Sequence, residues 1–248
     1  MQSQIQEFFR GKSVAERAIL ARSAGAHLTG PGRPLGDRRA AEELARHLAC
    51  DAIEAVREQL SKAVRHSRVL PRDVAMTIAH DIDAVACPFL EVTEVFSEED
   101  WQQLVRSISS GAQVAVARRP DLSEGLVESL AEVGDAHVAE TLIGNVEAPI
   151  NVSAYSAIIV RLGDTPWILD SLVEQRPLPA EVAVMLISKV SEAAREKLAE
   201  KYDLNDFTTP VVAEATDCAL LGVIQDAEGD QFAHSEAKRP LIPIQNGH

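Results

Sequence analysis

The chain has 248 residues, of which 46% are hydrophobic and only 4% aromatic, and its formal net charge is −14. Ala, Leu and Val dominate, and small aliphatic residues of this kind suit closely stacked helices. No apolar run approaches the about 20 residues that a membrane span needs. The start, Met1–Ile5, lacks the pattern of an export signal. We therefore expect a cytoplasmic, all-α protein that does not bind membranes.

The charge is unevenly distributed along the chain. Residues 1 to 70 hold 12 of the 24 Lys and Arg but only 8 of the 38 Asp and Glu, a net charge of +4, so the remainder carries −18. An acidic surface repels phosphate backbones, which argues against nucleic acid as a partner. The charge either serves solubility or meets a surface of opposite sign on a partner or second subunit.

The first 36 residues are predicted to form N-terminal helices and a linker. Ser13 and Glu16 match a capping box, which marks the start of a helix. The segment Gly25–Gly36 is rich in Gly and Pro, so it is expected to break the helix. After it, an apolar stripe from Leu44 to Val64 keeps helical spacing and predicts one long helix ending near Arg68.

A repeat occupies most of the remaining chain. A hydrophobic anchor followed by Ser or Pro recurs at intervals of 26 or 30 residues, at Leu70-Pro71, Phe96-Ser97, Leu122-Ser123, Val152-Ser153 and Leu178-Pro179. Ser suits the N-cap of a helix and Pro its first turn. A fixed period of this size indicates a repeat architecture, because each unit buries its apolar face against its neighbours.

Each unit is predicted to contain two helices. The inward positions of the first helix are expected at Val74, Trp101, Leu126, Ala157 and Val182, and one turn later at Ile78, Leu104, Leu130, Val160 and Leu186. Residues that can cap a second helix follow at Asp83, Ser109, Asp135, Asp164 and Ser191. Stacked hairpins of this kind predict an α-solenoid with two layers of helices.

Three regions follow from these patterns. Residues 1–36 hold the N-terminal helices and linker, residues 37–226 the solenoid, and residues 227–248 a flexible C-terminal tail without periodicity. A last helix is expected to begin after Thr209 and to run through Ile224, closing the final hairpin.

Several motifs in the repeats resemble a family of alphaproteobacterial proteins of unknown function that is built from HEAT-like helical repeats. The matching segments, within about residues 40 to 200, are Leu70–Val74, Ala79–Leu90, Ala117–Ser123, Leu142–Asn145 and Gln175–Pro179. His80 and Cys87 depart from the pattern expected of this family. The resemblance implies a HEAT-like solenoid from a bacterial cytoplasm, and it supplies no catalytic residue or cofactor.

One cluster could hold a metal ion. His80, Asp81 and Asp83, together with His47, His66, Asp135 and Asp164, follow the order of ligands in helical metal-dependent phosphohydrolases. The repeat register offers a simpler explanation, because three of these aspartates fall at equivalent capping positions along the stack. We therefore predict no metal, cofactor or catalytic residue, and we keep a phosphohydrolase using His80 and Asp81 as the alternative.

The candidate site is a rim for partner binding. Arg118, Arg119 and Arg176 precede the starts of repeats. They either cover helix ends or pair with acidic neighbours such as Asp121, or they recognise a carboxylate or phosphorylated partner. Trp101 and Trp167 are expected in the core. Cys50, Cys87 and Cys218 are far apart and are interpreted as small buried hydrophobes.

The favoured hypothesis is a non-catalytic scaffold or adaptor that binds other proteins through its solenoid. A role in bacterial signalling rests only on analogy with other repeat proteins. A homodimeric structural module, joined through residues 1–36, is a further alternative. Phe8 and Phe9 would then lie either on the body of the protein or in the subunit contact.

Overall fold

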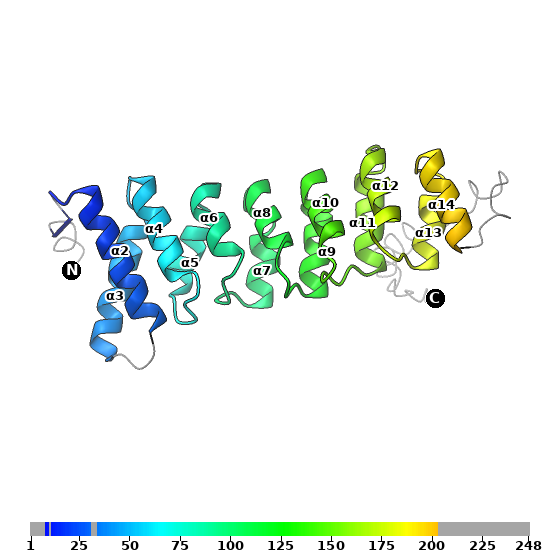
Figure 1. Cartoon of the computed structure of the whole chain (residues 1–248). Helices are drawn as coiled ribbons and strands as arrows, with labels where there is room; N and C mark the ends of the chain where they lie inside the picture. The colour runs from blue at the N-terminus through cyan, green and yellow to red at the C-terminus, as the bar shows by residue number, and fades with distance from the viewer. Residues whose placement is uncertain (1–7, 10, 31–33, 203–248) are drawn as a thin grey trace, which may run out of the picture.

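The computed structural model describes residues 8–9, 11–30 and 34–202, and every regular element in this part of the chain is helical. Neighbouring helices pack in sequence order and form one row of two layers (Figure 1). The prediction of an all-α solenoid is confirmed. The helices are α2 (Val14–Thr29), α3 (Leu35–Ala49), α4 (Glu54–Val64), α5 (Arg72–Ala79), α6 (Asp83–Leu90), α7 (Glu98–Leu104), α8 (Ser110–Ala117), α9 (Glu124–Val133), α10 (Ala136–Gly144), α11 (Val152–Arg161), α12 (Pro166–Gln175), α13 (Ala180–Leu186) and α14 (Glu192–Tyr202).

The hairpins share one continuous core. From α5 onward, odd-numbered helices are the first helices of their units and even-numbered helices the second, and helices of the same kind pack on each other from unit to unit. Each first helix contributes a side chain that is fully or almost fully buried, and these are Ile78, Leu104, Leu130, Ile158 and Leu186. Since every unit covers the apolar face of the next one, the fold is stabilised by stacking between neighbours.

The predicted starts of the first helices are correct in four of the five units. The anchors Leu70, Phe96, Leu122 and Leu178 are buried. Ser97 closes a capping box with Asp100, and the Ser123 hydroxyl accepts a hydrogen bond from the amide of Leu126 at 3.1 Å. Pro71 and Pro179 occupy the residue just before the helix, where their missing N–H leaves no bond unmade.

The prediction for the fourth unit is wrong by two residues. Val152 is exposed and Ser153 is not the cap; instead, the side-chain oxygen of Asn151 accepts from the amide of Ala154 at 3.0 Å. Val160 is likewise exposed and Ala157 only partly buried, whereas Ala154 and Ile158 point into the core. Asn caps a helix as well as Ser does, so a search for Ser or Pro missed the true start.

The second helices are capped as predicted in three units. The side chains of Ser109, Asp135 and Ser191 accept hydrogen bonds from backbone amides at the starts of α8, α10 and α14. The predictions for Asp83 and Asp164 are wrong. Asp83 is the first residue of α6 and accepts a bond from the Ser109 hydroxyl at 2.5 Å, while Thr165 precedes α12.

The N-terminal region differs from the prediction in two places. Helix α2 does not break at Gly25 but continues to Thr29, so the linker is shorter than expected. The single helix expected up to Arg68 is divided into α3 and α4, because Asp51 turns the chain and accepts from the amide of Ile53 at 2.9 Å. The helix expected at 209–224 and the tail at 227–248 lie outside the described residues.

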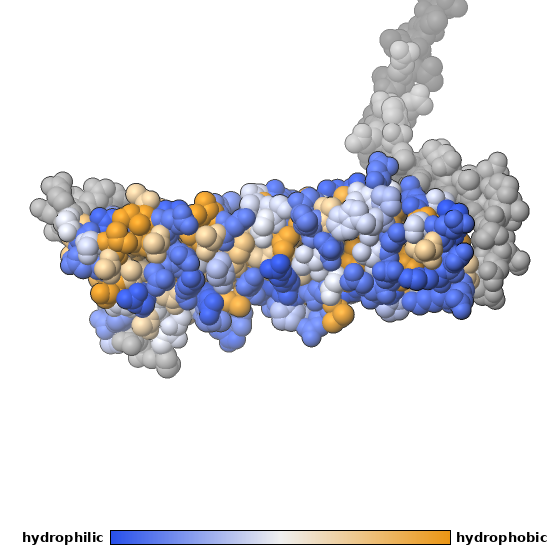
Figure 2. All heavy atoms as spheres, turned by 45° about the horizontal axis from the view of Figure 1, so that its top comes forward, coloured by the Kyte–Doolittle hydropathy of each residue, from blue (hydrophilic) through white to orange (hydrophobic). Residues whose placement is uncertain are grey.

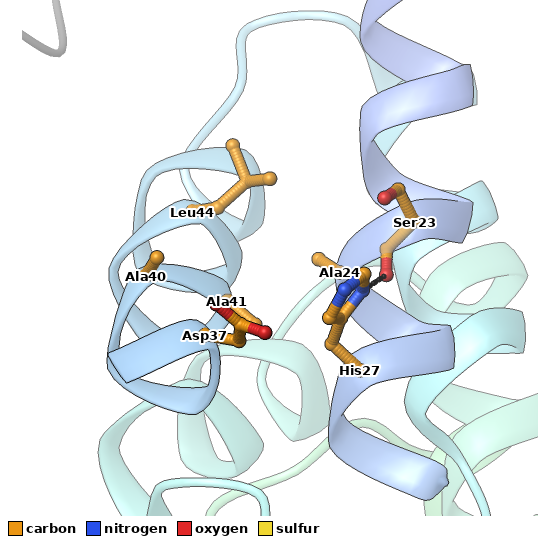
Figure 3. A pocket seen from close by; sticks show the side chains of 7 residues that line it. All are labelled: Ser23, Ala24, His27, Asp37, Ala40, Ala41 and Leu44. Atoms are coloured by element: carbon orange, nitrogen blue, oxygen red, sulfur yellow. Dashed lines mark hydrogen bonds between the residues drawn. The ribbon is translucent and has the colours of Figure 1, made fainter. Parts of the chain in front are cut away.

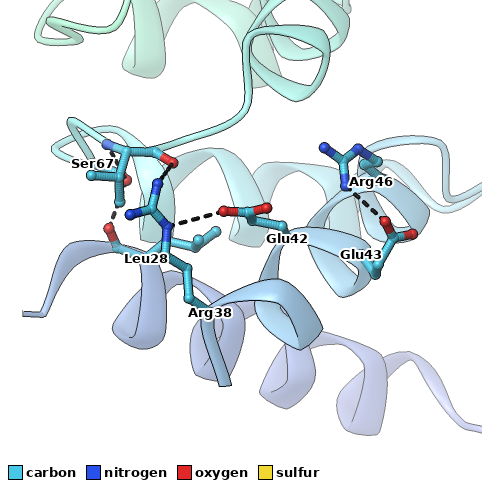
Figure 4. Close-up of polar contacts among 7 residues, drawn as sticks. Leu28, Arg38, Glu42, Glu43, Arg46 and Ser67 are labelled. Atoms are coloured by element: carbon cyan, nitrogen blue, oxygen red, sulfur yellow. Dashed lines mark hydrogen bonds and ion pairs between the residues drawn. The ribbon is translucent and has the colours of Figure 1, made fainter. Parts of the chain in front are cut away.

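Side chains from later turns hold the N-terminal helices in place (Figure 4). The Ser67 hydroxyl, which follows α4, donates to the backbone carbonyl of Leu28 at the end of α2 at 2.7 Å. On α3, Arg38 pairs with Glu42, and Arg46 bonds to Glu43 and also reaches Asp73 of the next hairpin. A carbonyl at the end of α2 is thus bonded by a side chain from the turn after α4.

The expected burial of some large side chains and cysteines is wrong. Trp101 is buried, but Trp167 is exposed at the start of α12. Phe9 is buried against the ring of His47, while Phe8 is exposed. Cys50 is exposed and Cys87 partly buried, and Cys218 lies outside the described residues. Among the described helices, none combines the length and apolar character of a membrane-crossing segment.

The close approach of α2 and α4 yields a stability prediction. A Cβ atom at Gly25 would lie 2.4 Å from the Cβ of Ala63 and 2.6 Å from its carbonyl oxygen, whereas one at Gly36 meets nothing within 4 Å. We expect Gly25→Ala to lower the free energy of unfolding by about 1–3 kcal/mol through overpacking. Gly36→Ala, within α3, should raise it by about 0.5–1 kcal/mol. Denaturant unfolding of both variants checks this, and equal effects would contradict it.

Candidate functional site

Arg119, one of the predicted partner-binding arginines, is 5% exposed. Its guanidinium donates to the carbonyls of Leu90 and Thr93 at 2.9 Å each and to Asp121 at 2.8 Å. It also lies 4.9 Å from the ring centre of Trp101. The carbonyls stand at the end of α6, where a helix leaves acceptors without intrahelical donors. Arg119 therefore caps the helix of the preceding unit and cannot present its charge to a partner.

Arg176 and Asn145 do the same for later units. Arg176 donates to the carbonyls of Ile143 and Ala148 at 3.0 Å each, and also to that of Asn145, at the end of α10. The Asn145 amide donates to the carbonyls of Ala117 and Arg119 at 2.9 and 2.7 Å, at the end of α8. Successive second helices are thus capped from the unit that follows, and of the two alternatives for Arg119 and Arg176 the observed contacts match the covering of helix ends.

Arg118 is the member of the predicted rim that remains accessible. It is 64% exposed in its side chain, and its guanidinium lies 4.0 Å from Glu91. It lines a hollow of about 470 Å³ between the ends of α8 and α10. Pro120, Thr141 and Val146 also line this hollow, and Val146 is 82% exposed. An exposed cation beside an exposed apolar side chain offers both kinds of contact that a protein partner uses.

The cluster around His80 and Asp81 connects hairpins. The two ring nitrogens of His80 lie 2.9 Å from the carbonyl of Met76 and 2.9 Å from the hydroxyl of Ser107 in the next unit. Asp81 accepts two bonds from Arg57 at 2.6 and 2.9 Å. Burial raises the pKa of Asp81, but the bonds from Arg57 and a backbone amide outweigh it, so the pKa is lowered on balance. Each group already has its partners within the fold.

The other members of the proposed metal cluster lie apart. Asp135 caps α10 and bonds to Ser110, Asp164 is exposed, and His47 stacks on Phe9. Within the described ranges, no three His, Cys, Asp or Glu side chains converge in a way that could hold a metal ion. The stacking of the units separates equivalent residues along the solenoid instead of bringing them together.

A second set of inter-unit contacts escaped the sequence analysis. Arg46 bonds to Asp73 at 2.7 Å and Arg72 to Asp100 at 2.9 Å, which links successive first helices. The two partners are 27 and 28 residues apart, which is close to one repeat length. A search for opposite charges at that offset would have found them. Such pairs fix the alignment of neighbouring hairpins more than they stabilise the fold, since most of these side chains are exposed.

The N-terminal end of the stack has a different surface. Hydrophobic residues gather at this end, at the left of the view in Figure 2, and Val14 and Ile19 of α2 are exposed. A hollow of about 190 Å³ lies between α2 and α3 (Figure 3). Ala24, Ala41 and Leu44 give it apolar walls, and Ser23, His27 and Asp37 complete its polar side. Exposed apolar side chains of α2 thus accompany a small, partly polar hollow at this end of the stack.

These features define an all-α solenoid protein whose helix ends and first helices are joined by polar side chains from unit to unit. Residues 85–239 match the model of a bacterial family described as "Uncharacterised protein conserved in bacteria (DUF2336)", and the chain belongs to this family. The match begins within α6 and spans the later repeats. No curated protein and no solved structure matches the chain.

The capping role of Arg119 predicts unequal effects for two neighbouring arginines. Arg119→Ala leaves the buried carbonyls of Leu90 and Thr93 without donors and should lower the free energy of unfolding by at least about 2 kcal/mol. Arg118→Ala removes an exposed side chain and should change it by less than about 0.5 kcal/mol. Thermal unfolding of the two variants measures the difference. Similar melting temperatures for both would refute the capping role.

The contact between Arg72 and Asp100 predicts a dependence on pH. The bond from Arg72 lowers the pKa of Asp100 to about 2, and the amide and hydroxyl of Ser97 act in the same direction. Because this carboxyl group is more acidic in the folded than in the unfolded state, its charge stabilises the fold at pH values above the unfolded pKa of about 4. The stability lost in Asp100→Asn should therefore be constant above about pH 4 and shrink as the pH falls to 2.

Urea midpoints measured across this pH range test the expectation for Asp100. Glu99→Gln, at an exposed neighbouring position on α7, is the control, since no ion pair ties Glu99 to another described residue. If the difference in urea midpoint between Asp100→Asn and the intact chain stayed the same down to pH 2, the carboxylate charge would make no contribution to stability.

Proposed function

We propose that this protein is a non-catalytic scaffold that binds another protein through the surface around Arg118. The observation that carries the proposal is the contrast along one rim. Arg119, Asn145 and Arg176 are engaged with backbone carbonyls of their own chain, whereas Arg118 stays exposed beside an open hollow. Its contact with the exposed Glu91, at 4.0 Å, is a weak one that the carboxylate of a partner can replace.

The surface next to Arg118 supports a protein as the ligand. Thr141 and Gly144 of α10 line the hollow and are small, so the backbone of a partner can approach this helix closely. Val146 offers an apolar contact at the edge of the hollow. Arg118 is suited to a carboxylate, which it can bind through two parallel hydrogen bonds. The preferred ligand is therefore a protein segment with an acidic residue next to an apolar one.

The proposal also covers the type of repeat and the place where the protein works. We infer that the hairpins are HEAT-like repeats and that the protein works in the cytoplasm of an alphaproteobacterium. The motifs from Leu70 to Pro179 support the repeat type, and the free thiol of Cys50 suits a reducing compartment. A role in signalling follows from the use of such repeats as adaptors, by analogy only.

The proposal predicts a selective loss of binding. A protein captured from bacterial extract by the intact chain should be lost from Arg118→Glu, because the reversed charge repels an acidic ligand. Arg106→Glu is the matched control, since Arg106 is an exposed arginine at the other end of the same hairpin, paired with Glu132. Quantitative mass spectrometry of the three captures provides the measurement. Equal recovery of every protein by Arg118→Glu and the intact chain would refute this site.

A further inference from the structure

The outward face of α2 is the starting point for a further inference. The opposite side of α2 packs against α3 and α4 through Ala21, Ala24 and Leu28. Ala15, Ile19 and Ala26 share the outward face and are exposed, with Ile19 at 55%. Arg22 and Ser23 are exposed on the same side, so this face combines one large apolar side chain with small and polar ones.

The position of α2 makes this composition unusual. A helix at the end of a solenoid has no further unit beside it, so its outer face is normally polar. At the other end of the described stack, α14 exposes Glu192, Glu196 and Glu200 and follows this rule. Helix α2 departs from this rule at Ile19, a large apolar side chain that is exposed on its outer side.

The charges on α2 indicate what covers it. Glu16 and Arg22 each lie three residues from Ile19, one towards each end of the helix. In an antiparallel pair of α2 helices with Ile19 at the two-fold axis, each of these residues lies about 4.5 Å along the helix from the centre. Arg22 is then level with the partner's Glu16, and the same contact is repeated on the other side of the axis.

The bonds within the chain leave this pairing open. Glu16 uses its Oε2 atom for the capping box with Ser13, and Arg22 donates to Gln59 through Nη1 at 3.3 Å. The remaining carboxylate oxygen and guanidinium nitrogen are left for a contact between chains. A surface that complements itself in this manner favours a closed two-fold dimer over an open chain of subunits.

We propose that the protein forms a homodimer through the outward faces of two antiparallel α2 helices, centred on Ile19. The two solenoids then extend away from the axis, and each carries its own Arg118 hollow. Two equal binding sites on one particle raise the apparent affinity for a partner that is itself multivalent. The dimer contact does not depend on the function proposed for Arg118.

The mass of the full-length chain in solution tests the dimer. At a chain concentration of about 100 µM, high enough to populate a weak complex, light scattering should give the mass of two chains. Ile19→Glu should raise the dissociation constant by about tenfold or more, because it places two carboxylates at the axis. Val160→Glu is the matched control, an exposed residue of α11 far from α2, and it should keep the dimer.

A charge exchange tests the antiparallel arrangement. Arg22→Glu chains carry two acidic groups on this face and Glu16→Arg chains carry two basic ones, so each variant should be monomeric alone. An equimolar mixture should recover the mass of two chains, because both contacts are then between opposite charges. A monomeric intact chain, a dimer unaffected by Ile19→Glu, or a mixture that fails to associate would each overturn the proposal. Circular dichroism of every variant separates loss of dimer from loss of fold.

Discussion

The solenoid depends on the satisfaction of backbone carbonyls at the ends of short helices. Helices α5 to α13 have only 7 to 10 residues, and each leaves up to four carbonyls without intrahelical donors. Arg119, Asn145 and Arg176 supply donors from the following unit. An isolated hairpin would lack these donors, so capping and apolar stacking together make the row of units cooperative.

This constraint explains why residues of catalytic appearance serve the fold. His80, Asp81 and Asp135 are bonded across the turns between helices, and Arg57 holds Asp81 from the preceding hairpin. Because stacked units are offset along one axis, residues at equivalent positions form rows instead of clusters. The same geometry leaves Arg118 exposed next to the buried Arg119, although the two residues are adjacent in the sequence.

The two proposed surfaces lie in different parts of the stack and depend on different interactions. The hollow at Arg118 combines a cation with exposed Val146, whereas the outward face of α2 depends on the apolar side chain of Ile19. A solenoid tolerates this separation because its units contact only their neighbours. Dimerisation at one end therefore leaves the shape of the distant hollow unchanged, and each surface can evolve with its own partner.

The sequence by itself determined the all-α class, the repeat and most helix starts, because capping by Ser and burial of an anchor such as Leu122 are local properties. It failed at Val152, where Asn151 is the cap, and at Gly25, which lies within α2 where the helix approaches Ala63 too closely for a side chain. Only the tertiary structure decided which arginines face solvent. The carbonyls that Arg119 and Arg176 bind lie 26 to 33 residues earlier in the chain. Whether these guanidinium groups are engaged or exposed therefore depends on how the units stack.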